Sequence, residues 1–191
     1  MDISKIQEKV SFILSPNRFK HTLGVAQTAR ELAIKLGADP LKAELAGLLH
    51  DIAKEYKAVQ LLESARKFCI VISNIDRISP HLLHARVGAC IAREQFNIKD
   101  SEILSAIAQH TLGKANMSLL EQILFLADAI EPNRPMEWAE PIRLELKERG
   151  LTSAIVKSCQ ITIKEVAEKG FLLHPITVET YNFYLGKLIN L

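Results

Sequence analysis

The sequence has little of what marks disordered or disulfide-rich chains. Its 191 residues include only 8 glycines and 7 prolines, too few for a low-complexity chain. The three cysteines, Cys69, Cys90 and Cys159, form an odd and widely spaced set, which fits neither a disulfide framework nor a zinc ribbon. Because each has apolar neighbours, we expect buried free thiols in a reducing compartment.

Long apolar runs and blocks of one charge are also missing. The most apolar stretch, residues 123–130, is short and is interrupted by Asp128, so no membrane-spanning helix is expected. Residues 1–5 lack the apolar core of a signal peptide. The net charge is +2, and no run of Lys or Arg exceeds two residues, which argues against nucleic acid. We expect a cytoplasmic protein with neither a membrane nor a nucleic-acid partner.

Apolar residues recur at helical spacing along nearly the whole chain, and no strand pattern of convincing length occurs. Ser, Asp and Pro at segment starts, with Gly after some segment ends, divide this pattern into helices. The predicted helices cover residues 3–13, 16–36, 40–51, 57–67, 80–96, 100–110, 119–130, 141–149, 152–169 and 177–190. Residues 69–79 are expected to form a loop with at most one extended piece.

The length and the hydrophobic content of 48% suit one domain with a substantial core. No linker rich in Gly, Ser or Pro divides the chain. The sequence therefore predicts an all-α multi-helix bundle, with a single domain over residues 1–191. Residues 136–191 are expected to form C-terminal helices packed on that bundle.

Two adjacent ionisable residues, His50 and Asp51, stand where an apolar helix is about to end. Burying either side chain without a partner would cost on the order of several kcal/mol. A bound metal ion would account for both, because neutral imidazole and carboxylate are good ligands for first-row metals. This pair therefore raises the question of whether the chain supplies further ligands.

His21 and Asp128 can complete a coordination shell. Both lie in apolar helical contexts, as His50 and Asp51 do. Together the four would form a metal site built from three helices, which is how helical bundles commonly hold metals. Two imidazoles and two carboxylates without a thiolate suit Fe, Mn, Co, Zn or Mg, with a preference for a redox-capable metal or zinc.

His84 and His110 also lie near the inner faces of their predicted helices. They could bind a second metal bridged by Asp51, hold a substrate phosphate, or protonate a leaving oxygen. The sequence leaves these roles open. A single histidine on an apolar helix is more often an ordinary core residue, but four histidines and two aspartates would need several independent explanations. His81, in the first turn after Pro80, is expected at the surface.

Three basic residues accompany the candidate ligands. Arg18 lies one turn before His21, Lys54 lies one turn after His50, and Arg134 follows Asp128 in a loop. They could clamp phosphate groups or could be ordinary solvated bases. The apolar segment Phe171-Leu172-Leu173-His174-Pro175 could cover a base or ribose, or could simply connect two helices.

Four stretches carry a resemblance to a known family. They are Arg18-Phe-Lys-His-Thr-Leu-Gly-Val25, Gly47-Leu-Leu-His-Asp-Ile-Ala-Lys54, Leu83-His-Ala-Arg-Val-Gly88 and Leu126-Ala-Asp-Ala-Ile-Glu-Pro-Asn-Arg134. The chain resembles the HD-domain metal-dependent phosphohydrolases, and more closely the bacterial HD-domain symmetrical bis(5'-nucleosyl)-tetraphosphatases. The resemblance extends over about residues 4 to 188, and its last stretch is the most specific.

That resemblance implies hydrolysis of diadenosine tetraphosphate into two ADP by a homodimeric enzyme, with iron as the metal. It implies the metal ligands His21, His50, Asp51 and Asp128. It also implies nucleotide contacts at Arg18, His84, His110, Arg134 and residues 171–175.

For the reaction, we expect a metal-activated water to attack an inner phosphate in line. Asp51, Lys54, His84 and His110 would form the catalytic group, with Lys54 also binding substrate. One alternative is an HD enzyme acting on a deoxynucleotide, guanosine tetraphosphate, a cyclic nucleotide or an NAD-related compound. Others are a non-catalytic nucleotide-binding module and a plain helical interaction protein.

Overall fold

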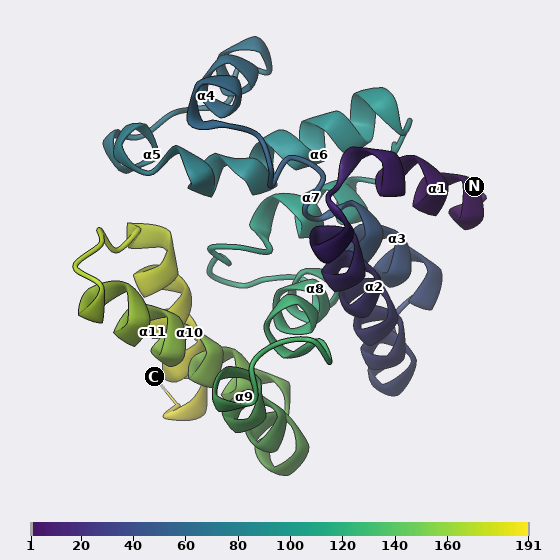
Figure 1. Ribbon diagram of the computed structural model, residues 1–191. Coiled ribbons are helices and arrows are strands. Elements are labelled where there is room, and N and C mark those ends of the chain that lie inside the picture. The colour runs from purple at the N-terminus through teal and green to yellow at the C-terminus, as the bar shows by residue number, and fades with distance from the viewer. Residues whose placement is uncertain (1, 191) are drawn as a thin grey trace.

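The computed structural model describes residues 2–190, and every regular element in that range is helical (Figure 1). The all-α prediction is therefore confirmed. The elements in chain order are α1 (Ile3–Ile13), α2 (Pro16–Leu36), α3 (Pro40–Leu49), α4 (Ala58–Lys67), α5 (Asn74–Ile78), the 3-10 helix η1 (Pro80–Leu83), α6 (His84–Gln95), α7 (Ser101–Gln109), α8 (Leu119–Ile130), α9 (Met136–Arg149), α10 (Leu151–Glu168) and α11 (Pro175–Leu188).

Capping side chains determine where several of the helices begin. The Asp39 carboxylate accepts from the backbone N–H groups of Leu41 and Lys42, which satisfies donors that a helix leaves free. Ser118 and Glu121 form a reciprocal capping box at the start of α8. These local bonds explain why the predicted starts of α3 and α8 agree with the structure.

Two predictions of secondary structure were wrong. Residues 74–78 form α5 rather than a loop or an extended piece, because Ser73 and Asp76 make a capping box. α9 begins at Met136, and Pro141, the predicted start of this helix, lies inside it. Proline forfeits one backbone bond there, to the carbonyl of residue 137, and the rest of the helix is retained.

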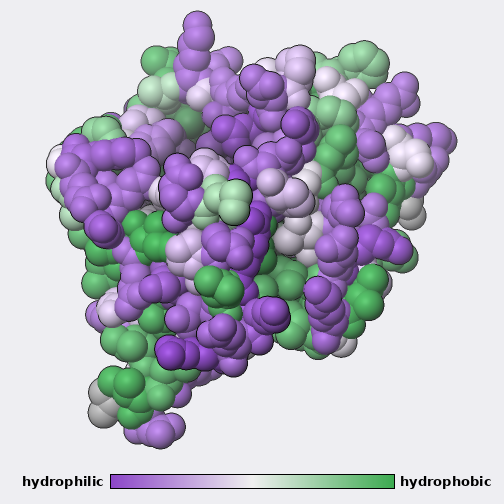
Figure 2. Space-filling view, turned by 60° about the horizontal axis from the view of Figure 1, so that its bottom comes forward, coloured by the Kyte–Doolittle hydropathy of each residue, from purple (hydrophilic) through white to green (hydrophobic). Residues whose placement is uncertain are grey.

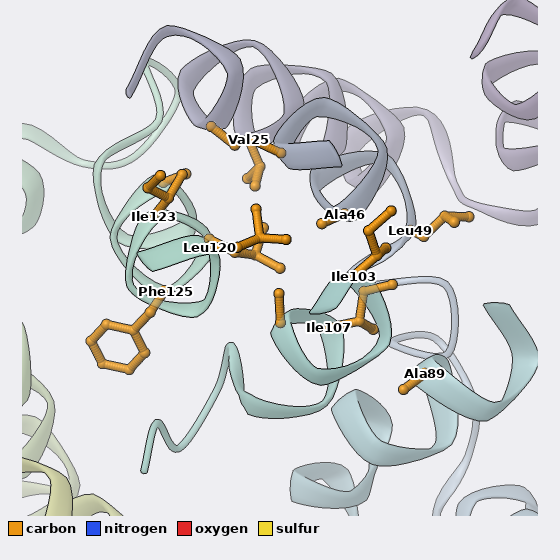
Figure 3. Close-up of a cluster of buried hydrophobic side chains, with 14 of the residues drawn as sticks. Val25, Ala46, Leu49, Ala89, Ile103, Ile107, Leu120, Ile123 and Phe125 are labelled. Atoms are coloured by element: carbon orange, nitrogen blue, oxygen red, sulfur yellow. The ribbon is translucent and has the colours of Figure 1, made fainter. Parts of the chain in front are cut away.

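α2 and α8 form the centre of the bundle, with α3 packed along α2 and α7 packed against both α6 and α8 (Figure 1). Their apolar faces meet in a buried core, of which Val25, Leu49, Ile107 and Ile123 are members (Figure 3). α2 and α3 cross closely at Gly47, where a Cβ atom would lie only 2.5 Å from the Cα of Ala26. This close crossing brings His21 on α2 toward the end of α3.

The last three helices lie on one side of α8, and α10 contacts α8, α9 and α11 (Figure 1). The hydroxyl of Tyr184, on α11, accepts a bond from the backbone N–H of Met117 at 3.0 Å. Thr180 donates to the carbonyl oxygen of Leu112 at 3.1 Å. These contacts join α11 to the segment between α7 and α8. The extension of one domain over residues 1–191 stays a prediction.

The surface is mixed, with polar and apolar side chains interspersed over the face shown in Figure 2. Among residues 2–190, no helix combines the length and apolarity needed to cross a membrane. All three cysteines are free thiols, but only Cys159 is buried, while Cys90 is partly buried and Cys69 is exposed. The expectation of three buried thiols was therefore wrong, because Cys69 follows α4 in an exposed turn with a φ of 55°.

Candidate metal centre and active site

Six ionisable side chains from five places in the chain converge inside the bundle. His21 comes from α2, His50 and Asp51 directly follow α3, His84 begins α6, His110 follows α7, and Asp128 lies in the last turn of α8. His50 is fully buried, and Asp51 is 2% exposed. Three overlapping triads could each hold a metal ion, because the potential ligand atoms within each triad lie within 4.8 Å of one another. The triads are His21, His50 and Asp51; His50, His110 and Asp128; and Asp51, His84 and His110.

Backbone carbonyls orient three of the four histidines. Nδ1 of His50 lies 2.7 Å from the carbonyl oxygen of Gly47, and Nδ1 of His84 lies 2.6 Å from that of His81. Nδ1 of His110 lies 2.8 Å from the carbonyl oxygen of Ile107. Because a carbonyl oxygen only accepts, each Nδ1 must carry the proton, which leaves a lone pair on each neutral ring's Nε2.

These Nε2 atoms point at the carboxylates. Nε2 of His84 and of His110 lie 3.2 and 3.5 Å from Oδ1 of Asp51, while Nε2 of His50 lies 3.4 Å from Oδ2. Nε2 of His21 lies 3.1 Å from Oδ1 of Asp128.

Buried lone pairs need a partner. Nε2 of His21, Nε2 of His50 and Oδ1 of Asp51 are buried without a hydrogen-bond partner. Unpartnered buried polar atoms are rare in folded proteins and costly. Lone pairs of imidazole and carboxylate that face one another are relieved by a cation, so this donor set fits a first-row metal ion.

The charges of the neighbours keep both aspartates ionised. Burial alone would raise the pKa of Asp51, but the close imidazoles of His50, His110 and His84 hold it well below its usual range. Burial also acts to raise the pKa of Asp128, but the nearby ring of His21 and the charge of Arg134 hold it well below its usual range. The centre therefore presents carboxylates, the form that binds a cation.

The three predicted basic residues all lie beside this centre. Arg18 donates from Nη1 to Oδ2 of Asp51 at 3.0 Å. Arg134 donates from Nε to the backbone oxygen of Asp128 at 2.8 Å, and its Nη2 also contacts the Asp128 carboxylate. Nζ of Lys54 lies 3.1 Å from Nε2 of His84 and 3.9 Å from Oδ1 of Asp51.

A cavity of about 390 Å³ opens onto this centre at His21. Its walls come from the start of α2, from the loop after α8 and from Glu55, with basic and amide groups among them. They include Asn17, Arg18, Lys20, Asn133 and Arg134. This cavity can therefore receive an anionic chain that reaches toward Asp51 and Asp128.

Residues 171–175 occupy a different place. Phe171 and Leu172 are 67% and 49% exposed, and Nε2 of His174 lies 4.0 Å from Oδ1 of Asp76. Among the described residues, no hydrogen bond or ion pair joins this loop to the six convergent side chains. The substrate contacts predicted for these five residues stay predictions. His81 is exposed, as expected.

Two residues at the centre were missed from the sequence. Oγ1 of Thr111 lies 3.1 Å from Nε2 of both His84 and His110. Glu131 is 1% exposed, and its Oε1 lies 3.0 Å from Nδ1 of His21. Glu131 follows Asp128 by one helical turn and lies inside the most specific stretch of the family resemblance, whereas no sequence pattern distinguished Thr111.

Comparison with known proteins agrees with this geometry. The family model described as "HD domain" matches residues 18–133. "Bis(5'-nucleosyl)-tetraphosphatase, symmetrical" of Halalkalibacterium halodurans is 40% identical over 182 residues, which are 95% of this chain and 96% of that protein. The protein of the same name from Bacillus subtilis is 36% identical, over 91% of this chain and 92% of that one.

A solved structure is also similar to this chain over nearly its full length. It is described as a predicted HD superfamily hydrolase involved in NAD metabolism, from Clostridium acetobutylicum, with a TM-score of 0.93 and 36% identity over 98% of each chain. The match to the family model, and the large share of each chain that these relatives cover, establish the family to which the chain belongs. The chain belongs to the HD-domain family and, within it, to the symmetrical bis(5'-nucleosyl)-tetraphosphatases.

Proposed function

We propose that this protein is a metal-dependent hydrolase that cleaves diadenosine tetraphosphate symmetrically into two ADP. The observation that carries this function is the buried convergence of imidazole Nε2 atoms on two carboxylates beside a cavity lined by arginines. High-coverage relatives that bear the name of this activity support it. The reaction adds the elements of water across the central phosphoanhydride bond, so that each half leaves as ADP.

His21, His50, Asp51 and Asp128 would hold the metal. A bound transition metal supplies Lewis acidity, which lowers the pKa of water and withdraws charge from a phosphoryl oxygen. We propose iron, because the family resemblance implies it and the nitrogen and oxygen donors suit it. Asp51, His84 and His110 also form one of the compact triads, so a second metal held by these three is the alternative to a proton-transfer role for the two histidines.

Arg18 and Arg134 would bind the phosphate chain. Both line the cavity while contacting the candidate ligands Asp51 and Asp128. Guanidinium groups bind phosphate oxygens through paired N–H donors, so each arginine can neutralise negative charge on a bridging or terminal phosphate. Their fixed position relative to the carboxylates would set which phosphorus faces the attacking water.

The opposite edge of Asp51 carries the groups suited to proton transfer. Nζ of Lys54, Nε2 of His84 and Nε2 of His110 all lie within 3.9 Å of Oδ1 of Asp51. We propose that Lys54 neutralises charge on the phosphate oxygens, and that His84 or His110 gives a proton to the departing ADP oxygen.

Burial lowers the pKa of His84 to about 4, so its ring is neutral at pH 7 in this arrangement. Burial also lowers the pKa of His110, so either ring would take the proton that it donates from a water beside it. Thr111, with its hydroxyl beside both rings, is placed to orient that donor.

Symmetric cleavage would follow from the register in which the tetraphosphate chain lies along these side chains. One ADP half would lie along Arg18 and Arg134, and the other along Lys54, with residues 171–175 covering a base or ribose. We further propose a homodimer in the cytoplasm, on the family resemblance. Its small-molecule ligands would be the dinucleoside polyphosphate and ADP.

The decisive experiment pairs anaerobic metal analysis with product identification. The protein purified without oxygen should carry close to one equivalent of iron or more, and its product from diadenosine tetraphosphate should be ADP alone. Release of ATP plus AMP would contradict symmetric cleavage. The NAD-related alternative is retained because the Clostridium acetobutylicum relative is described in those terms. A panel with deoxynucleotides, guanosine tetraphosphate, cyclic nucleotides and NAD-related compounds decides between these substrates.

A further inference from the structure

One of the four histidines at the centre is oriented differently from the rest. His50, His84 and His110 each place Nδ1 against a backbone carbonyl three residues earlier. His21 places Nδ1 against the side chain of Glu131, with Oε1 at 3.0 Å. A residue 110 positions away in the sequence therefore orients this ring.

Glu131 is held rigidly in this contact. It is 1% exposed, and its second oxygen, Oε2, accepts from the backbone N–H of Asn133 at 2.7 Å and from Nδ2 of the same residue at 2.8 Å. Arg143 donates to the backbone oxygen of Glu131 at 3.0 Å. Both the carboxylate and the backbone of Glu131 are thus anchored before any ligand arrives.

α2 is shaped to admit this carboxylate. Gly24 lies one helical turn after His21, and a Cβ atom at that position would meet Oε2 of Glu131 at 2.3 Å. No real Cβ tolerates such a distance, so any larger residue would displace the carboxylate. The absence of a side chain at Gly24 is therefore a condition for the contact between Glu131 and His21.

We propose that Glu131 is a positioning residue that fixes His21 with its Nε2 lone pair toward the centre and strengthens it as a metal ligand. Nδ1 and Nε2 lie on opposite edges of the ring, so Glu131 supports the ligand and is not itself one. A carboxylate increases the basicity of an imidazole ligand more than a carbonyl does, because it carries a full negative charge. The inference rests on the metal site of the proposed function, and is independent of the substrate.

The first test is Glu131→Gln, measured as Zn²⁺ affinity by chelator competition on metal-stripped protein. Glutamine keeps the shape but removes the charge and cannot accept on both sides, so affinity should fall about 10- to 100-fold. Glu121→Gln is the matched control. Glu121 is 2% exposed, lies in the first turn of α8, which ends just before Glu131, and bonds to Ser105 and Ser118, away from His21. Its variant should keep Zn²⁺ affinity within about twofold.

The second test leaves every charge in place. Gly24→Ala should weaken Zn²⁺ binding about 10-fold, because the new methyl group displaces Glu131. Gly88→Ala is its control, since a Cβ there meets its nearest atoms at an ordinary 3.5 Å. Equal Zn²⁺ affinity in Glu131→Gln, Gly24→Ala and the parent would overturn the inference, as would equal weakening in Glu121→Gln.

A spectroscopic readout separates orientation from general damage. In the Zn²⁺-loaded parent, the His21 Nδ1 proton should give a protected, far-downfield NMR signal; in Glu131→Gln it should shift upfield or exchange away. An unchanged signal overturns the inference. Enzyme activity is a separate readout. If the parent protein binds Zn²⁺ or iron but releases no ADP, the proposed function is contradicted, while these affinity comparisons remain valid.

Discussion

Oδ1 of Asp51 lies 3.2 Å from Nε2 of His84, although the two residues are 33 positions apart in the sequence. The same carboxylate uses Oδ2 to face His50 at 3.4 Å. Asp51 therefore lies between two sets of imidazoles, and each of its two oxygens faces a different set. This arrangement makes Asp51 the residue on which the whole centre depends.

Asp51→Asn should abolish metal binding and lower turnover of diadenosine tetraphosphate by more than about 100-fold, since a ligand is lost rather than an outer partner. The amide keeps the size of the side chain but removes its charge. Metal content and ADP release are the measurements. Asp100→Asn serves as the control, because Asp100 is partly exposed and caps α7. Asp51→Asn protein with normal metal and turnover would refute the proposed centre.

Arg134→Ala should raise KM about 10-fold and leave metal bound. The guanidinium faces the cavity and is held on Asp128, so its loss removes a phosphate contact worth about 1.4 kcal/mol. Steady-state kinetics and metal analysis measure the two effects. Arg149→Ala, at a side chain 71% exposed, should change neither. Loss of metal in Arg134→Ala would instead assign Arg134 a role in holding Asp128.

Gly47→Ala should destabilise the fold by about 1–3 kcal/mol, because the new Cβ would meet the backbone of α2 at 2.5 Å. The helices would have to separate, and the carbonyl of Gly47 that orients His50 would shift with them. Urea unfolding of the metal-free protein measures the change. Gly88→Ala has room for its methyl group and should be neutral or slightly stabilising. Equal stability of the two variants would contradict the close crossing of α2 and α3.

Tyr184→Phe should cost about 1–3 kcal/mol of stability, because the buried N–H of Met117 would lose its acceptor. The effect should appear in urea unfolding as one cooperative transition at a lower midpoint. Tyr181→Phe, at a partly buried neighbour, is the control and should change little. Two separate transitions in the parent protein would show that α11 unfolds apart from the bundle.

The cysteines should react with disulfide reagents in a fixed order. Cys69 is exposed and should react within seconds at pH 8. Burial raises the pKa of Cys159 to about 12, so the thiolate that reacts is scarce and is also sheltered. Burial likewise raises the pKa of the half-buried Cys90. Timed labelling with mass spectrometry should show Cys69 first and Cys159 only after unfolding. Rapid modification of native Cys159 would contradict this packing.

The sequence by itself determined the helices and the candidate ligands. Periodicity and capping depend on neighbours within a few residues, which is why Asp39 and Ser118 marked true helix starts. Polar groups inside apolar helices are also visible locally, so His21, His50, Asp51 and Asp128 could be identified before any contact was known. The same local reasoning failed at Pro141, where packing of the helix outweighed a residue that usually marks its beginning.

Only the tertiary structure decided which of these groups meet. The 3.0 Å contact of Glu131 with His21 spans 110 residues, and the placement of Thr111 beside His84 spans 27. Such pairings depend on how α2, α6, α7 and α8 pack, and sequence spacing does not encode a distance between helices. The close crossing at Gly47 and the space left by Gly24 are features of packing, where a single methyl group separates an open contact from a clash.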